Sequence, residues 1–272
     1  MIEVQSKLDR KILEYLKEKS YGTTELVTKL MLSGVTKQGI YARLRKLKKD
    51  EIIVLHNKRI SLNTLWISKS IAELEHLLSV YTKKAVGKDN VHGLEEGDSV
   101  TYRFRDPNTT DSFWGHAMLQ LLQIMQRGEA VYLYNPHQWF LLVRRESEMQ
   151  LVEEIVRHGC NFFLTVGSKT NLDEQTKKVL KGKNIECHVC LAPLFKNNYY
   201  VNVFGEYVIE VWLDKKVSFA IDAFYHKVTD VTDTQKTKLK EIVSRKGNNK
   251  MVISRNKVKA EKIRKRLAKY FY

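Results

Sequence analysis

Residues 23–63, TTELVTKLMLSGVTKQGIYARLRKLKKDEIIVLHNKRISLN, decide the fold of the first part of the chain. Two short helices are predicted there, one capped by Thr23 or Thr24 and ending at Leu32, the other over residues 36–49. Each has an apolar face at helical spacing, formed by Leu26, Val27 and Leu30 in the first and by Ile40, Leu44 and Leu47 in the second. The residues between them, Ser33 and Gly34, predict a tight turn. This arrangement is typical of a helix-turn-helix motif.

The segments on either side complete a winged helix. Residues 7–18 form an amphipathic helix, whose apolar face is made of Leu8, Ile12, Leu13 and Leu16. Residues 52–63 predict a β-hairpin, because a turn at residues 56–58 is followed by Ile60 and Leu62 alternating with polar side chains. Residues 1–67 are therefore predicted to form a winged helix-turn-helix domain.

Counted from the helix over residues 7–18, the helix over about residues 36–49 is the third of the domain. It presents an outward face of Gln38, Tyr41, Ala42 and Arg45. In a DNA major groove glutamine pairs with adenine and arginine with guanine, while alanine or tyrosine contacts a thymine methyl. Basic residues on its flanks and on the hairpin would lie near phosphates. The full set of expected DNA-contacting residues is Thr36, Lys37, Gln38, Tyr41, Ala42, Arg43, Arg45, Lys46, Lys58 and Arg59. Winged helices that bind proteins are the alternative, but residues 3–19 carry 5 basic against 4 acidic side chains, so the basic charge is concentrated on the third helix and the hairpin.

The charge of the whole chain is concentrated at its ends. The 272 residues carry a formal net charge of +16. Residues 1–84 have 17 basic and 9 acidic side chains, residues 85–234 have 16 and 20, and residues 235–272 have 14 and 2. Basic ends around a slightly acidic middle favour contact with a polyanion at the ends, although charged helices facing solvent give a similar count.

Composition excludes several protein classes. The length predicts roughly two folded units. The 3 cysteines are too few for a disulfide framework. A membrane-spanning apolar stretch is absent, and charges occupy the start, where a signal peptide needs an apolar core. We therefore expect a cytoplasmic protein with no membrane partner.

A connector is predicted over residues 68–98. Its first part, residues 68–84, is a helix with one apolar stripe formed by Ile71, Leu74, Leu77 or Leu78, and Tyr81. Such a stripe packs on its own domain or pairs with a second copy. A homodimer is attractive, because two recognition helices read paired half-sites on one duplex. Residues 85–98 have the composition of a loop.

The second unit, residues 99–272, alternates strands and helices. The predicted helices span residues 112–127, 138–158, 172–180, 234–243 and 258–271, and the predicted strands span residues 130–134, 161–166, 185–192, 199–203, 207–213, 217–221 and 251–253. This alternation predicts an α/β domain whose sheet is substantially parallel and turns antiparallel at residues 199–221. The fold class is therefore α/β, with an N-terminal winged helix-turn-helix followed by an α/β sheet domain.

A winged helix, a connector helix and the run EYVIEVWLDKKVSFAID at residues 206–222 together resemble the TrmB-type transcriptional regulators. The strand over residues 185–192, which follows Lys181-Gly182-Lys183-Asn184, takes the place of that family's second-half strand. The resemblance implies a phospholipase-D-like second domain without catalytic activity, which dimerises and senses a small-molecule effector.

Catalytic and cofactor motifs are missing. Phospholipase-D chemistry needs His-x-Lys-x4-Asp, with histidine as nucleophile and lysine on the phosphate. His-x-Lys occurs only at His56, where Asn63 stands in place of the aspartate. Nucleotide-binding and hydrolase motifs are also absent. We therefore expect no enzymatic activity and no cofactor.

A zinc site is a weaker alternative. Cys187, Cys190, Cys160 and His158 are the available ligands, but the first two face opposite sides of a predicted strand. Buried thiols and no bound metal are therefore expected.

Two further groups lie late in the chain. The late-strand carboxylates Glu206, Glu210, Asp214 and Asp222, together with Trp212, are candidates for lining a polar ligand pocket. The terminal helix combines the apolar stripe Val258, Ile263, Leu267 and Tyr270 or Phe271 with seven basic side chains. Its basic face suits DNA phosphates, with a membrane surface as the alternative.

The sequence thus predicts a dimeric, sequence-specific DNA-binding transcriptional regulator. The alternative is a nucleic-acid-processing enzyme that uses its winged helix to dock the substrate.

Overall fold

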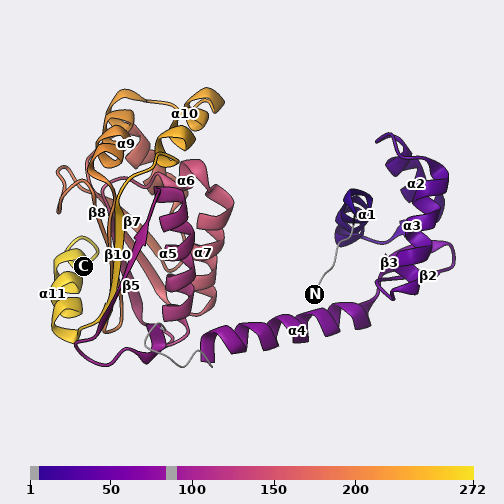
Figure 1. The fold of residues 1–272 in the computed structure, drawn as a ribbon, viewed down its shortest axis with the longest axis horizontal. Coiled ribbons are helices and arrows are strands. Elements are labelled where there is room, and N and C mark those ends of the chain that lie inside the picture. The colour runs from indigo at the N-terminus through magenta and orange to yellow at the C-terminus, as the bar shows by residue number, and fades with distance from the viewer. Residues whose placement is uncertain (1–5, 84–90) are drawn as a thin grey trace. The chain divides into compact units, whose positions relative to one another are not determined.

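The computed structural model describes residues 6–83 and 91–272 (Figure 1). The chain divides into two compact units, residues 1–84 and residues 85–272. The division falls inside the predicted connector, residues 68–98, and places its helix with the first unit. Residue 84, the last of the predicted connector helix, and residues 85–90 of the expected loop lie outside the described part.

The first unit packs helices on a small antiparallel sheet. Its elements are α1 (Lys7–Glu18), β1 (Tyr21–Gly22), α2 (Thr23–Met31), α3 (Lys37–Lys49), β2 (Ile53–His56), β3 (Arg59–Leu62) and α4 (Thr64–Lys83). The three strands are ordered β1-β3-β2. The predicted helices and hairpin are confirmed, whereas the short strand β1 was not expected. Residues Ile12, Leu26, Leu30, Ile40, Leu47 and Ile60 form the centre of the core.

The start of α2 differs from expectation. Its N-cap is Gly22, which has no side chain to cap the helix. The Thr23 hydroxyl instead donates to the Lys58 carbonyl oxygen at 3.0 Å, and the Thr23 amide donates to the same oxygen at 2.8 Å. Asn57 and Lys58 both have positive φ, at 48° and 58°, as a two-residue hairpin turn requires. These bonds hold the tip of the hairpin against the start of α2.

The connector helix α4 begins at Thr64, four residues earlier than predicted. Its apolar side chains Leu65, Ile71, Leu74 and Leu77 are exposed, with Leu74 at 54% of its full accessibility. The side chains of Leu78 and Tyr81 lie outside the described part.

The second unit is built on a seven-stranded mixed sheet. Its strands are β4 (Ser99–Phe104), β5 (Ala130–Asn135), β6 (Asn161–Val166), β7 (Ile185–Val189), β8 (Tyr199–Phe204), β9 (Tyr207–Trp212) and β10 (Asn249–Arg255), in the order β4-β10-β9-β8-β5-β6-β7. β5, β6 and β7 pair in parallel, and the other neighbouring strands pair antiparallel. The α/β class is therefore confirmed, but the sheet is less parallel than predicted.

One predicted strand is a helix. Residues 217–221 lie in α9 (Lys215–Lys227), because the Asp214 carboxylate accepts bonds from the amides of Lys216 and Val217 and caps the helix. Val217, Ile221 and Phe224 then recur at helical spacing in the core. The antiparallel edge of the sheet is completed instead by β4, which was not predicted.

Helices cover both faces of this sheet (Figure 1). The other helices are α5 (Pro107–Leu122), α6 (Phe140–Val143), α7 (Arg145–Arg157), α8 (Asn171–Val179), α10 (Asp233–Val243) and α11 (Lys257–Ala268), and Val91–Gly93 forms a 3₁₀ turn. One core lies under α5, α7, α9 and α10, and the other lies under α11. Alternate residues of β5 serve the two cores, Val131 and Leu133 the first, Tyr132 and Tyr134 the second. Among the described residues, none of the helices is long and apolar enough to cross a bilayer.

A buried histidine ties the end of β5 to two helices. His137 Nδ1 lies 3.1 Å from an Asp173 oxygen on α8, and Nε2 lies 3.1 Å from an Asp222 oxygen on α9. Its ring stacks on Tyr225 at 4.2 Å between centroids. Burial opposes the charged form, but the two carboxylates outweigh it and raise the pKa of His137.

We predict that His137→Gln destabilises the second unit by roughly 3 kcal/mol near pH 6, because it leaves the buried Asp173 and the half-buried Asp222 carboxylates without their cation. The pKa of His137 is raised in the folded chain, so its stabilisation is present below the unfolded value of about 6.5 and is lost as pH rises through the folded value. Urea unfolding should therefore show a smaller difference between variant and wild type near pH 9. The exposed His116→Gln on α5 is the control. A difference that stays constant across this pH range would contradict the prediction.

Candidate functional site

The outward face of α3 is accessible. Its buried stripe, Ile40, Leu44 and Leu47, is held in the core of the first unit. The side chains on the opposite side are exposed: Lys37, Gln38, Tyr41, Ala42, Arg45, Lys46, Lys48 and Lys49. Thr36 caps the helix, with its hydroxyl accepting the Gly39 amide at 3.2 Å. The structure thus brings together on one face the side chains predicted to read bases.

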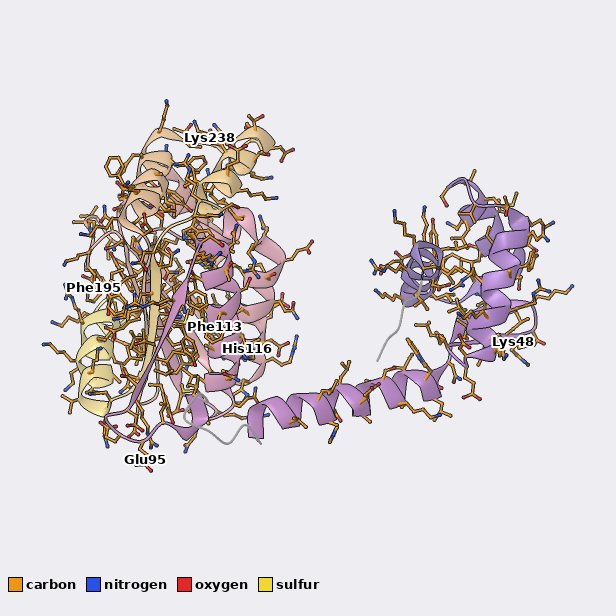
Figure 2. The ribbon with its side chains drawn as sticks, viewed as in Figure 1. Lys48, Glu95, Phe113, His116, Phe195 and Lys238 are labelled. Atoms are coloured by element: carbon orange, nitrogen blue, oxygen red, sulfur yellow. The ribbon has the colours of Figure 1, made fainter. Side chains whose placement is uncertain are left out.

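Basic charge dominates this face. Residues 36–63 carry eight basic side chains against two acidic ones, Asp50 and Glu51, which lie where α3 ends. Lys48 projects from α3 (Figure 2). Lys58 occupies the hairpin turn between β2 and β3. A surface with this charge attracts polyanions.

A hollow of about 170 Å³ lies between α3 and the hairpin. It is lined by Thr23, Tyr41, Leu44, Arg45, Lys48, Ile53, Leu55 and Ile60. The sequence did not predict the part of the lining that β2 contributes. Leu55 of β2 lines the hollow and is 46% exposed. The sequence did contain a signal for it, since residues 52–55 form an unbroken apolar run and a strand buries only alternate residues. The hollow offers an apolar contact beside two cations.

Arg43 and Arg59, which were both expected to contact DNA, also make contacts within the domain. Arg43 Nε donates to Asp9 Oδ1 at 2.7 Å, and its Nη2 donates to the other oxygen. The Asp9 side chain is 3% exposed. Burial would raise the pKa of Asp9, but the bonds from Arg43 and Ser6 lower it. Arg59 Nη2 donates to the Ser20 carbonyl oxygen at 2.9 Å. These two guanidiniums hold α3 and β3 against neighbouring segments.

The terminal helix α11 also differs from expectation. Val258 is 78% exposed, and Ala260 takes its place in the buried stripe with Ile263 and Leu267. Several cations are engaged within the domain: Lys259 pairs with Glu210, Arg264 donates to the Gly205 carbonyl oxygen, and Arg266 donates to that of Leu194. Its basic face therefore offers less charge to a phosphate backbone than the sequence suggested.

The late-strand carboxylates do not form one pocket. Glu210 accepts a bond of 2.9 Å from the Tyr199 hydroxyl, and Glu206 pairs with Arg255. Asp214 caps α9, and Asp222 faces His137. The predicted shared ligand pocket is therefore wrong.

The cysteines are buried thiols. Cys160, Cys187 and Cys190 are all free. Burial raises the pKa of Cys187 to about 12. In the part of the chain that the structure describes, His, Cys, Asp and Glu form no group suited to a metal ion.

Comparison with known proteins finds no family model and no curated protein that matches the chain. Several solved structures resemble it, among them the following two. One is TrmBL2, described as an archaeal chromatin protein with a novel mode of DNA binding; it is 14% identical, has a TM-score of 0.39, and the match covers 97% of this chain and 91% of that one. The other is NucT from Helicobacter pylori, 10% identical with a TM-score of 0.37, over 64% of this chain and 96% of that one. Both likenesses are weak in sequence and in superposition.

We predict that Arg43→Ala destabilises the first unit by about 2 kcal/mol, because it leaves the buried Asp9 carboxylate without its donor. Arg45→Ala, which removes the same charge from the exposed face of the same helix, should change stability by less than about 0.5 kcal/mol. Thermal unfolding followed by circular dichroism measures both. If Arg43→Ala lowered the stability no more than Arg45→Ala does, the pair of Arg43 with Asp9 would contribute nothing specific to the fold.

Proposed function

We propose that this protein is a sequence-specific DNA-binding transcriptional regulator in which α3 enters the major groove. The observation that carries the proposal is the exposed face of α3, where Gln38, Tyr41 and Arg45 lie together among cations while Ile40, Leu44 and Leu47 hold the helix in the core. A helix with these side chains can pair with base edges and neutralise phosphates at once.

The roles on this face follow from side-chain chemistry. Arg45 is suited to guanine and Gln38 to adenine, and Tyr41 is suited to a thymine methyl. Leu55 extends the apolar surface beside Tyr41, in the hollow that both line. Lys58 in the hairpin turn, with Lys37, Lys46 and Lys48, contributes phosphate contacts that carry no sequence information. Arg43 and Arg59 support this surface by positioning α3 and β3.

A homodimer is part of the proposal. α4 exposes Ile71, Leu74 and Leu77 along its length, which is more apolar surface than a helix in water ordinarily shows. Pairing two such helices would bury the stripe and bring two copies of α3 to one duplex.

The second unit is proposed to be non-catalytic and phospholipase-D-like, with a role in dimerisation or effector sensing. The His-x-Lys pair is absent from it, and its buried His137 already uses both ring nitrogens on Asp173 and Asp222. A cytoplasmic location belongs to the same proposal. The resemblance to TrmB-type regulators supports these assignments.

The test for base reading uses duplexes selected by the full-length protein from a random pool. Tyr41→Ala with Arg45→Ala should reduce the preference for selected over scrambled duplex by roughly tenfold or more, because each good base contact is worth about 1–3 kcal/mol. Residual, salt-sensitive binding should remain. Lys58→Ala should weaken binding to both duplexes alike and reduce the salt slope by about 1.

The control for this test is Lys11→Ala, a charge removed from the exposed face of α1. It should leave the preference unchanged. A Tyr41 and Arg45 variant with full preference would reject α3 as the reading element. The same assays run with Mg²⁺ should return full-length duplex, and cleavage that requires the second unit would favour the enzyme alternative.

We predict that Ile71→Glu with Leu74→Glu converts a dimer into a monomer, since charge on the stripe opposes its burial. Ala72→Glu, which adds a carboxylate to another side of α4, should leave the dimer intact. Sedimentation velocity of the full chain reports both. A monomeric wild type at tens of micromolar, or a dimeric double variant, would contradict the proposed interface.

A further inference from the structure

A groove runs between α9 and α10 in the second unit. Its volume is about 400 Å³, within the usual range of small-molecule sites. The two helices follow one another in the chain and lie together at one end of the sheet, where Lys238 is labelled (Figures 1 and 2). The apolar lining is Ala220, Ala223, Phe224, Val228 and Ile242.

The charged lining of the groove is entirely basic. Lys227 ends α9, Lys238 lies on α10, and Arg245 follows α10. All three side chains are exposed, and none takes part in an ion pair among the described residues. Lys236 on the same helix, by contrast, pairs with Asp233 at 3.0 Å. Three cations without a counter-charge around one hollow create a local positive potential.

The acidic residues nearby lie outside the groove. Asp233 and Glu241 line a neighbouring hollow of about 570 Å³ together with Lys238. Asp222, on the same helix as Lys227, is bound to His137. Gln235, the remaining polar lining residue, already accepts the Thr232 amide at 2.8 Å through its side-chain oxygen. The positive charge of the groove therefore lacks compensation from its own walls.

We propose that this groove binds a small organic anion, a molecule with an apolar body and one carboxylate, sulfonate or phosphate group. The body would cover Phe224 and Ile242 while the anionic group meets Lys227, Lys238 or Arg245. A nucleic-acid backbone fits less well, because phosphates gain nothing from an apolar floor and require polar donors along an open track. The site is independent of α3 and does not depend on the proposed DNA binding.

The probe for this site is 8-anilinonaphthalene-1-sulfonate, which combines two aromatic groups with one sulfonate. Its uncharged counterpart is N-phenyl-1-naphthylamine. Fluorescence titration of the full-length protein should show saturable sulfonate binding near one dye per chain. Lys238→Glu with Arg245→Glu should raise the Kd of the sulfonate at least about tenfold, because like charges then face each other. The Kd of the uncharged dye should change less than about twofold.

Matched controls separate this site from others. Lys240→Glu reverses an exposed charge on the same helix outside the groove and should leave the sulfonate Kd within about twofold. Ala223→Trp fills the groove from an exposed position and should weaken both dyes. The proposal is overturned if Lys240→Glu acts as strongly as the paired reversal, or if Ala223→Trp leaves both dyes unaffected. Displacement of the sulfonate by a short DNA duplex, with parallel loss of duplex binding on Lys238→Glu, would make the groove a nucleic-acid surface instead.

Discussion

The burial of Ile40, Leu44 and Leu47 is the constraint on which the surface of the first unit depends. These side chains occupy one side of α3, so helical geometry sends Gln38, Tyr41 and Arg45 outward together. A rotation of α3 about its axis would expose the apolar stripe and bury the cations, which is costly on both counts. The core therefore determines which chemistry α3 presents.

This constraint explains which parts of the site could be predicted. Helical periodicity identified α1 over residues 7–18 and placed α3 within a residue of its observed start, and the hairpin followed from the turn before Arg59. Periodicity indicates which side chains face the core. It does not indicate which side chains at the edge of a helix form hydrogen bonds or ion pairs with another helix or strand. Arg43 lies at the side of α3, where Asp9 of α1 reaches it across 34 residues of sequence. Long-range pairs of this kind, and the strand β1 that exists only by pairing with β3, have no local signal.

The second unit shows the same limit on a larger scale. The strand over residues 161–166 was predicted to the residue, because its run is rich in aromatic and β-branched side chains and ends at Gly167. The run over residues 217–221 was wrongly predicted to be a strand, since five mostly apolar residues fit a strand or a helix equally well. The cap that Asp214 provides decides for the helix. β4 was missed because its side chains alternate between exposed and half-buried, a weak pattern on an edge strand. Parallel or antiparallel pairing depends on crossovers that no short window contains.

Formal charge and available charge differ, and this difference decides where an anion can bind. The last 38 residues carry 14 of the 47 basic side chains. On α11 many of these contact carboxylates or carbonyl oxygens of the same unit, for example Lys259 with Glu210 and Arg266 with Leu194. A cation engaged in this way has exchanged its water for protein oxygens and gives little to a further anion. The cations around the α9–α10 groove have no such partners among the described residues, and they lie beside apolar surface that excludes water. The number of basic residues in a segment therefore does not locate a binding site. The site lies where cations remain uncompensated next to a surface that a ligand can cover.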